Sequence, residues 1–343
     1  MLMKMRSVAL WVAIPFLCSA ESGVVKKAHR SGVATAEVAD RTPSVLWRDP
    51  GNLASRDLFF GPGGEKHQPP AAEFTFLKED SKGSNPKFVV QDVNGVKWKV
   101  KLGAEARPET VSTRFVWAVG YFADEDYFVP RLRIRNMPHL RRGGNVVKSD
   151  GAVHNARLER DSKSVQKVGN WRWKKDAFYG TREHNGLRVM MALINNWDLK
   201  DVNTAVYRDQ DDPAALHYAV SDLGVSFGTA GPDWPVGRSR GNLREYRNSR
   251  FISRVTPDTV SFAPPAWPAC IFLFHPPQYI HRIGLRWIGR KVPRSDVRWI
   301  AQMLAGLSPQ QIRDAFRAGG YEAKEIEDFT KVMQGRIAEL ARL

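Results

Sequence analysis

The chain has 343 residues, 43% of them hydrophobic, which is enough for one large domain or two lobes with a substantial core. Its formal net charge of +16 favours anionic partners such as nucleotides, nucleic acid or anionic lipid head groups, although a solvated basic surface without any partner fits equally well. Beyond the N-terminus no apolar run approaches the roughly 20 residues that span a bilayer, so we expect no stable transmembrane anchor.

The first 20 residues are typical of a signal peptide. Residues 1–6 form a short basic region with Lys4 and Arg6, residues 7–17 form an apolar run of eleven, and small residues follow. We therefore expect cleavage after Ala20 and export to the periplasm or the outside of the cell. Lipidation at Cys18 ranks second, because the leucine before it is larger than lipoprotein signals usually have at that position.

A glycine cluster is the first motif of the exported chain. Residues 21–44 lack a clean hydrophobic period and are expected to form a flexible leader. Gly61, Gly63 and Gly64 then follow an apolar triplet. Because glycines let backbone N–H groups approach phosphate oxygens, this cluster is a candidate phosphate-covering turn. Its spacing differs from GxGxxG and it contains a proline, so an ordinary loop is the alternative.

Three strands are expected next, at residues 74–80, 87–92 and 96–102, with an Asn-Gly turn between the second and the third. In the third strand the even positions are apolar and the odd positions 97, 99 and 101 are lysines. A solvated lysine face is one interpretation. The other is that one of these lysines enters a nucleotide cleft and contacts phosphate.

A helix is expected after these strands, with a proline beside Glu109 in its first turn and a glycine at its end. A lysine that contacts phosphate is positioned by a carboxylate on the next helix, so Lys101 and Glu109 are our first choice for this pair. Lys99 is the second choice for the lysine, and Glu105 is the alternative carboxylate. A strand after the helix completes a β-rich, nucleotide-binding N-lobe at residues 45–130.

The remaining residues, 131–343, are assigned to a C-lobe. Residues 131–188 mix aromatic and basic side chains, but no nucleic-acid module accompanies them, so we do not expect nucleic acid as a partner. Residues 262–284 have the composition of a buried segment between proline turns. Cys270 within them, the sole cysteine left after cleavage, cannot form an intramolecular disulfide and fits a buried position. Helices are expected at 295–307, 308–320 and 323–343.

Residues 190–228 carry the clearest functional pattern. Asp198 follows a helix-like apolar segment, Asn203 comes five residues later, and Asp222 begins an Asp-Leu-Gly triplet after a strand-like run. Enzymes that transfer phosphate place a catalytic carboxylate and two metal ligands in this order. A carboxylate, an amide oxygen and substrate phosphates are suitable ligands for Mg²⁺. Turn residues that cap strands are the alternative interpretation.

Three segments together resemble the atypical branch of the protein-kinase-like superfamily, near HipA-like kinases, CotH spore-coat kinases and phosphoinositide-type kinases: KLGAEARPETVSTRFVWAVGY, INNWDLKDVNTAVY and VSDLGVSFG. The resemblance covers only the surroundings of Lys101 and Glu109 and the stretch 190–228. It implies an α+β, two-lobed protein-kinase-like fold with a small β-rich N-lobe and a mostly helical C-lobe. It also implies ATP as the nucleotide, with Mg²⁺ or Mn²⁺.

By the same resemblance, Asp198 would orient or deprotonate an acceptor hydroxyl, and Lys101, held by Glu109, would contact phosphate. Asn203 and Asp222 would bind the metal. The expected activity is that of an exported phosphotransferase, which moves the γ-phosphate of ATP to an unknown protein, lipid or saccharide acceptor. The alternatives are an envelope pseudokinase or binding module without transfer, and a basic protein that binds polyanions.

Overall fold

The structure is a computed structural model that describes residues 42–80, 86–141, 147, 152–162, 164–228, 240–264 and 270–343. The chain divides into two units, residues 1–41 and 42–343, and every described residue belongs to the second. The expected signal peptide and nearly all of the expected leader therefore lie outside the described residues. Within the described ranges, none of the helices has the length and hydropathy that a membrane span requires.

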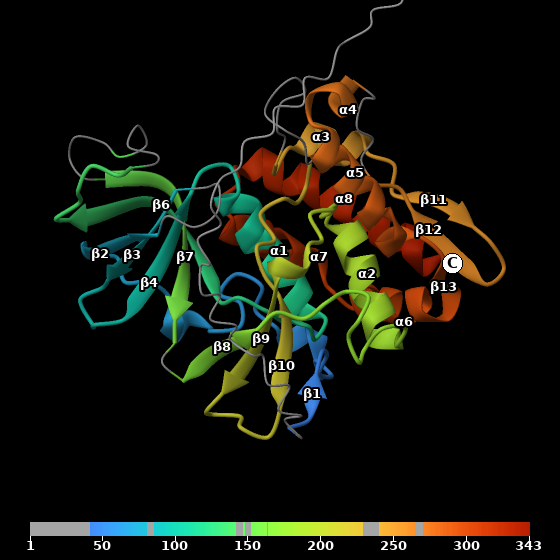
Figure 1. The fold of residues 1–343 in the computed structure, drawn as a ribbon, viewed down its shortest axis with the longest axis horizontal. Helices are drawn as coiled ribbons and strands as arrows, with labels where there is room; N and C mark the ends of the chain where they lie inside the picture. The colour runs from blue at the N-terminus through green and yellow to red at the C-terminus, as the bar shows by residue number, and fades with distance from the viewer. Residues whose placement is uncertain are drawn as a thin grey trace, which may run out of the picture. The chain divides into compact units, whose positions relative to one another are not determined.

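A closed barrel of five strands forms the β-rich part of the structure, in the order β2, β3, β4, β7, β6 (Figure 1). Alternation along each strand turns apolar side chains into the barrel, and Phe88, Trp98 and Leu158 there are at most 1% exposed. The β3–β4 turn includes Gly95, whose φ of +78° costs a glycine no strain. The strands are β2 Phe74–Asp80, β3 Lys87–Gln91, β4 Lys97–Leu102, β6 Asp126–Arg135 and β7 Ala152–Asp161.

The barrel continues past residue 130, where the sequence placed the end of the N-lobe. Strand β6 runs to Arg135 and pairs antiparallel with β7, so the barrel ends at Asp161. Strand β7 was not predicted from the sequence, because charged residues occupy part of its length. Helix α1, Ala106–Ala118, packs against β6 and β7 and places the acidic residues of its first turn beside the barrel.

Helices make up most of the C-terminal part, which confirms the predicted α+β class with a β-rich N-terminal part and a mostly helical C-terminal part. The three helices predicted at the C-terminus are present, and Ser308 caps α7 as its sequence indicates. Its hydroxyl accepts from the Gln311 N–H, and its own N–H donates to the Gln311 side chain. The helices of this part are α2 Arg182–Leu193, α3 Leu243–Asn248, α4 Cys270–Phe274, α5 Pro276–Leu285, α6 Arg294–Ala305, α7 Pro309–Ala318 and α8 Ala323–Ala341.

Outside the barrel, the described residues form a five-stranded sheet and a three-stranded sheet. In one, β9 pairs antiparallel with β10, which brings the ends of two candidate segments together: Ser221 N–H donates to the carbonyl of Asn203 at 3.0 Å. The other has the order β11-β12-β13. The strands are β1 Ser44–Val45, β5 Phe122–Ala123, β8 Val165–Gly169, β9 Thr204–Asp209, β10 Leu216–Val220, β11 Ile252–Val255, β12 Thr259–Phe262 and β13 Val292–Pro293.

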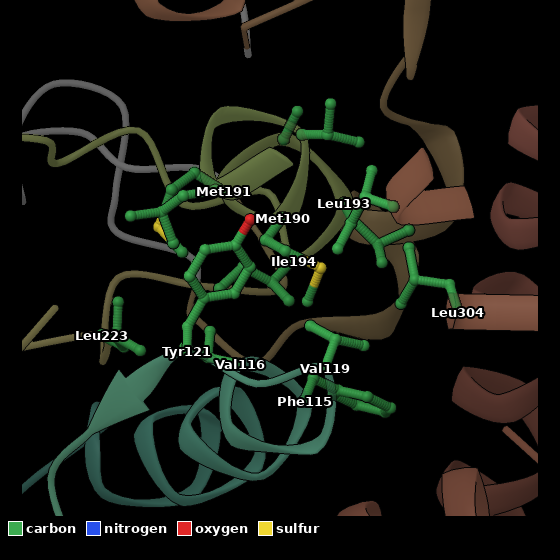
Figure 2. Packing of buried hydrophobic residues seen from close by; sticks show 14 of the residues in the cluster. Phe115, Val116, Val119, Tyr121, Met190, Met191, Leu193, Ile194, Leu223 and Leu304 are labelled. Atoms are coloured by element: carbon green, nitrogen blue, oxygen red, sulfur yellow. The ribbon is translucent and has the colours of Figure 1, made fainter. Parts of the chain in front are cut away.

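One apolar cluster connects α1, which carries Glu109, with the segments around Asp198 and Asp222 (Figure 2). It contains Phe115 of α1 and Ile194 at the end of α2, both fully buried. It also contains Leu223, which directly follows Asp222 and is 2% exposed. Each such buried side chain contributes about 1.5–3 kcal/mol. The helix before Asp198 and the turn at Asp222 are therefore fixed to the same core as α1.

The expectation of a buried segment at residues 262–284 is wrong for the described side chains of α4 and α5. Leu273 is 76% exposed and Ile280 is 60% exposed. The burial of Cys270 lies outside what the structure describes. An apolar run bounded by prolines looks the same in sequence whether another element covers it or not, and here the two short helices pack mainly on each other.

Candidate functional site

Lys101 lies on β4, and its ammonium contacts a carboxylate of α1, Glu109, and that of the N-cap residue Glu105. Its Nζ is 2.8 Å from Oε2 of Glu109 and 2.7 Å from Oε2 of Glu105, and it also forms an ion pair with Asp222. The sequence left Glu109 and Glu105 open as partners, and the structure has both, because residues four apart share one face of a helix. Burial acts to lower the pKa of Lys101, but Glu109, Asp222 and Glu105 together raise it above its ordinary value, so the side chain stays charged.

Lys101 is the centre of a row of three cations. In the strand register it lies between Lys87 of β3 and Arg157 of β7, and all three line the same cavity. Like charges directly across neighbouring strands repel each other and destabilise a sheet. Anions beside this row therefore stabilise it. The neighbouring carboxylates supply part of this negative charge, and a bound polyphosphate could supply the rest.

Asp222 follows β10 in the left-handed region of backbone space, with a φ of +53°. Aspartate tolerates this conformation better than most residues, and the buried Leu223 fixes the turn. Burial would raise the pKa of Asp222, but Lys101 and, to a smaller extent, Lys87 and Arg157 hold it at about 2. The carboxylate is therefore ionised at neutral pH, as a metal ligand must be.

Asp198 and Asn203 contact each other in the structure. The Asn203 amide donates to the Asp198 side chain at 3.1 Å and to its carbonyl at 2.7 Å. This leaves Oδ1 of Asn203 as its possible metal ligand. Lys200 is 2.8 Å from the other carboxylate oxygen of Asp198. The turn is held because Asn196 accepts a bond from the Asp198 N–H at 3.0 Å.

A cavity of about 870 Å³ opens beside Lys101, within the usual range for small-molecule sites. Glu109 and Asp222 line the cavity, as does Lys99, the second choice for the phosphate-contacting lysine. Asp198 and Asn203 are not among the lining residues, but Val202, which precedes Asn203, is. Its lining combines apolar side chains with lysines, an arginine and carboxylates. The lining also includes Leu77, Lys78, Phe88, Val89, Val100, Asp124, Glu159, Asp161, Lys167, Tyr207 and Ser221.

Oxygen ligands for a divalent cation are present at this cavity. Among the described acidic, histidine and cysteine side chains, one group brings its ligand atoms within 4.8 Å of one another: Glu105, Glu109 and Asp222. Hard oxygen donors of this kind fit Mg²⁺ or Mn²⁺. Asp222 belongs both to this group and to the predicted pair with Asn203, so it is the residue that would hold a metal in either arrangement.

The glycine cluster does not line this cavity, and its role as a phosphate cover stays a prediction. Gly61 lies against the guanidinium of Arg114, and Gly63 lies against Glu125 and Tyr127. Gly64 has open space around the position of a side chain. None of the three is among the lining residues. The glycines permit close packing and positive φ angles, which a sequence pattern cannot distinguish from a phosphate turn.

Two arginines complete the site and were missed in the sequence. Arg157 is 3.4 Å from the second carboxylate oxygen of Glu109, and its side chain is 7% exposed. Arg240 forms an ion pair with Glu105 and is 11% exposed. Alternation in β7 could have placed Arg157 on the lysine-bearing face, but only with the strand pairing known. No local signal connects Arg240 to Glu105.

No protein-family model and no curated protein matches the sequence. Among solved structures, the fold is similar to the crystal structure of CtkA, a proinflammatory kinase of Helicobacter pylori, with 11% identity over 80% of this chain and 97% of that chain and a TM-score of 0.41. It is also similar to the crystal structure of the Golgi casein kinase, with 11% identity over 78% of this chain and 75% of that chain and a TM-score of 0.30. Both are kinases, and likenesses this distant assign no activity or substrate to the chain.

Proposed function

We propose that this chain is an exported, kinase-like phosphotransferase that moves the γ-phosphate of ATP to a hydroxyl acceptor with Mg²⁺ or Mn²⁺. The observation that carries the proposal is the buried Lys101, held by Glu105 and Glu109 at a cavity of about 870 Å³. Burying a charged lysine costs free energy, so its position here calls for a reason. The three carboxylates can accept a metal, and the row of cations can accept phosphates. Export rests on the signal-like residues 1–20.

The residues would divide the work by charge and position. Lys101 and Lys87 would neutralise phosphate oxygens, and Glu109 would keep Lys101 aimed at them. Asp222 and Asn203 would hold the metal, which supplies further neutralisation of the transferred group. Asp198 would orient the acceptor hydroxyl and accept its proton.

The test is an ATP assay on the chain that begins at residue 21, with Mg²⁺ or Mn²⁺ and a mass-spectrometric search for phosphate on the protein and on envelope extracts. Asp198→Asn and Asp222→Asn are each expected to lower turnover by about 100-fold or more. Asp201→Asn is the matched control, because Asp201 lies in the same turn and its carboxylate bonds Trp173 N–H at 3.3 Å, which an amide oxygen can replace. Equal turnover in all three variants would refute the assignment of the site.

The direct ion pair of Lys101 and Asp222 favours a second candidate, a module that binds nucleotide without transfer. In this pair, the group expected to contact phosphate and the group expected to hold the metal are bonded to each other. For such a module, nucleotide and metal would raise the melting temperature, Asp222→Asn would abolish that rise, and no phosphorylated product would form in any extract.

A further inference from the structure

Five large apolar side chains project from two short adjoining helices. Phe272, Leu273 and Phe274 of α4 are 47%, 76% and 50% exposed, and Ile280 and Ile283 of α5 are 60% and 45% exposed. We call these five residues the α4–α5 patch. Single exposed apolar residues are ordinary, but five within twelve positions mark a surface that contacts something.

The α4–α5 patch is attached firmly to the fold. The ring of Phe272 meets that of Tyr279 edge-on, with centroids 5.8 Å apart, which joins the two helices. At its other end α5 continues into the 3₁₀ turn Arg286–Gly289, where Ile288 is fully buried in the main core. The patch is therefore presented by an anchored element, and its apolar residues do not belong to that core.

The charge around the patch is one-sided. No aspartate or glutamate occurs in the sequence between Asp258 and Asp296, while five lysines or arginines do. Three of them, Arg286, Arg290 and Lys291, directly follow α5, and within the described residues their side chains form no ion pair. Bulky apolar side chains followed closely in the chain by cations without an ion pair are the composition of an interfacial membrane element.

The dimensions exclude a span. Helix α4 has 5 residues and α5 has 10, which is far short of the roughly 20 needed to cross a bilayer. A second copy of the chain is disfavoured as the occupant, because a two-fold contact would bring the same basic segment, residues 259–295 without an acidic residue, of both copies together. An anionic lipid surface satisfies the apolar and the basic residues at once.

We infer that the α4–α5 patch docks this protein on the surface of a bilayer that contains anionic lipid. The five apolar side chains enter the interface, and Arg286, Arg290 and Lys291 lie at the level of the head groups. The attachment is peripheral and reversible, and it does not depend on the activity of the Lys101 site.

The test is co-flotation of the chain that begins at residue 21 with vesicles of phosphatidylcholine alone or mixed with phosphatidylglycerol. Starting there removes the apolar run 7–17, which would bind lipid by itself. The variant is Leu273→Ser/Ile280→Ser. The control, Val93→Ser/Val168→Ser, makes the same change at apolar residues of 65% and 46% exposure elsewhere.

Wild type and control are expected to float with the anionic vesicles, and the variant is expected to partition about tenfold more weakly, with equal melting temperatures for all three. Wild type that stays at the bottom of the gradient overturns the inference, as does a variant that floats like wild type. So does a wild-type dimer in light scattering that the variant converts to a monomer, because a second copy would then cover the patch.

Discussion

Glu109 and Arg157 form a buried ion pair at 3.4 Å, while the other carboxylate oxygen of Glu109 is 2.8 Å from the ammonium of Lys101. The side chains of Glu109 and Arg157 are 1% and 7% exposed. The Glu109 carboxylate is thus held between two strands, by Lys101 of β4 and by Arg157 of β7. The position of Lys101 therefore depends on Arg157 as well as on α1.

Replacing Arg157 with methionine is expected to lower the free energy of unfolding by about 3–5 kcal/mol, because Glu109 and Glu159 would keep buried charges without this partner. Urea unfolding at neutral pH measures it. The control is Arg135→Met, which breaks an exposed pair with Glu73 and should cost about 0–1 kcal/mol. If the two variants unfold alike, Arg157 does not support the site.

The two lysines considered from the sequence are expected to behave differently. Lys101 is 1% exposed and contacts three carboxylates, whereas Lys99 is 52% exposed and pairs with Glu159 at 2.9 Å. In the ATP assay, Lys101→Met should lower kcat/KM about 100-fold or more. Lys99→Met should change it by less than about threefold, because exposed pairs contribute little. The reverse order would make Lys99 the phosphate contact.

Local sequence patterns predicted the parts of the site that depend on local structure. Alternation in β4 and the helix after it placed Lys101 and Glu109 together, as the structure has them. Arg157 could not be found in this way, because its place depends on the pairing of β4 with β7, more than fifty residues further along the chain. Long-range strand pairing leaves no mark within a single segment.

The α4–α5 patch shows a second limit of the sequence. Leu273 and Ile280 occur in an apolar run of the kind that fills protein cores, and burial was the natural expectation. Whether such a run is covered depends on the elements that pack over it. Here the described neighbours leave both side chains largely exposed.

The glycine cluster gives a test that separates a packing role from a phosphate role. Gly61 has a φ of +75° and lies against Arg114, so Gly61→Ala should add an overpacking cost of about 1–3 kcal/mol to the backbone strain. Gly64→Ala meets no neighbour within 4 Å and should show the strain alone, about 1–3 kcal/mol, because Gly64 has a φ of +64° and a ψ of −174°. Urea unfolding measures both. Neither should alter the KM for ATP, and a large rise would return the cluster to the nucleotide site.

The last prediction concerns pH. Burial raises the pKa of Asp124, a residue of the cavity lining, and the nearby Glu159 raises it further, to about 7 from an ordinary 3.8. The folded chain therefore holds a proton here that the unfolded chain releases above about pH 4, so this group makes the free energy of unfolding fall as the pH rises toward about 7.

Asp124→Asn removes this titration, and its amide oxygen can still accept from the Tyr207 hydroxyl, now 2.7 Å from the carboxylate. Urea unfolding should show the variant gaining stability relative to wild type between about pH 5 and pH 8, whereas Asp258→Asn, on the exposed surface, should keep the wild-type profile. A constant difference between Asp124→Asn and wild type at every pH would mean that Asp124 is already ionised in the folded protein.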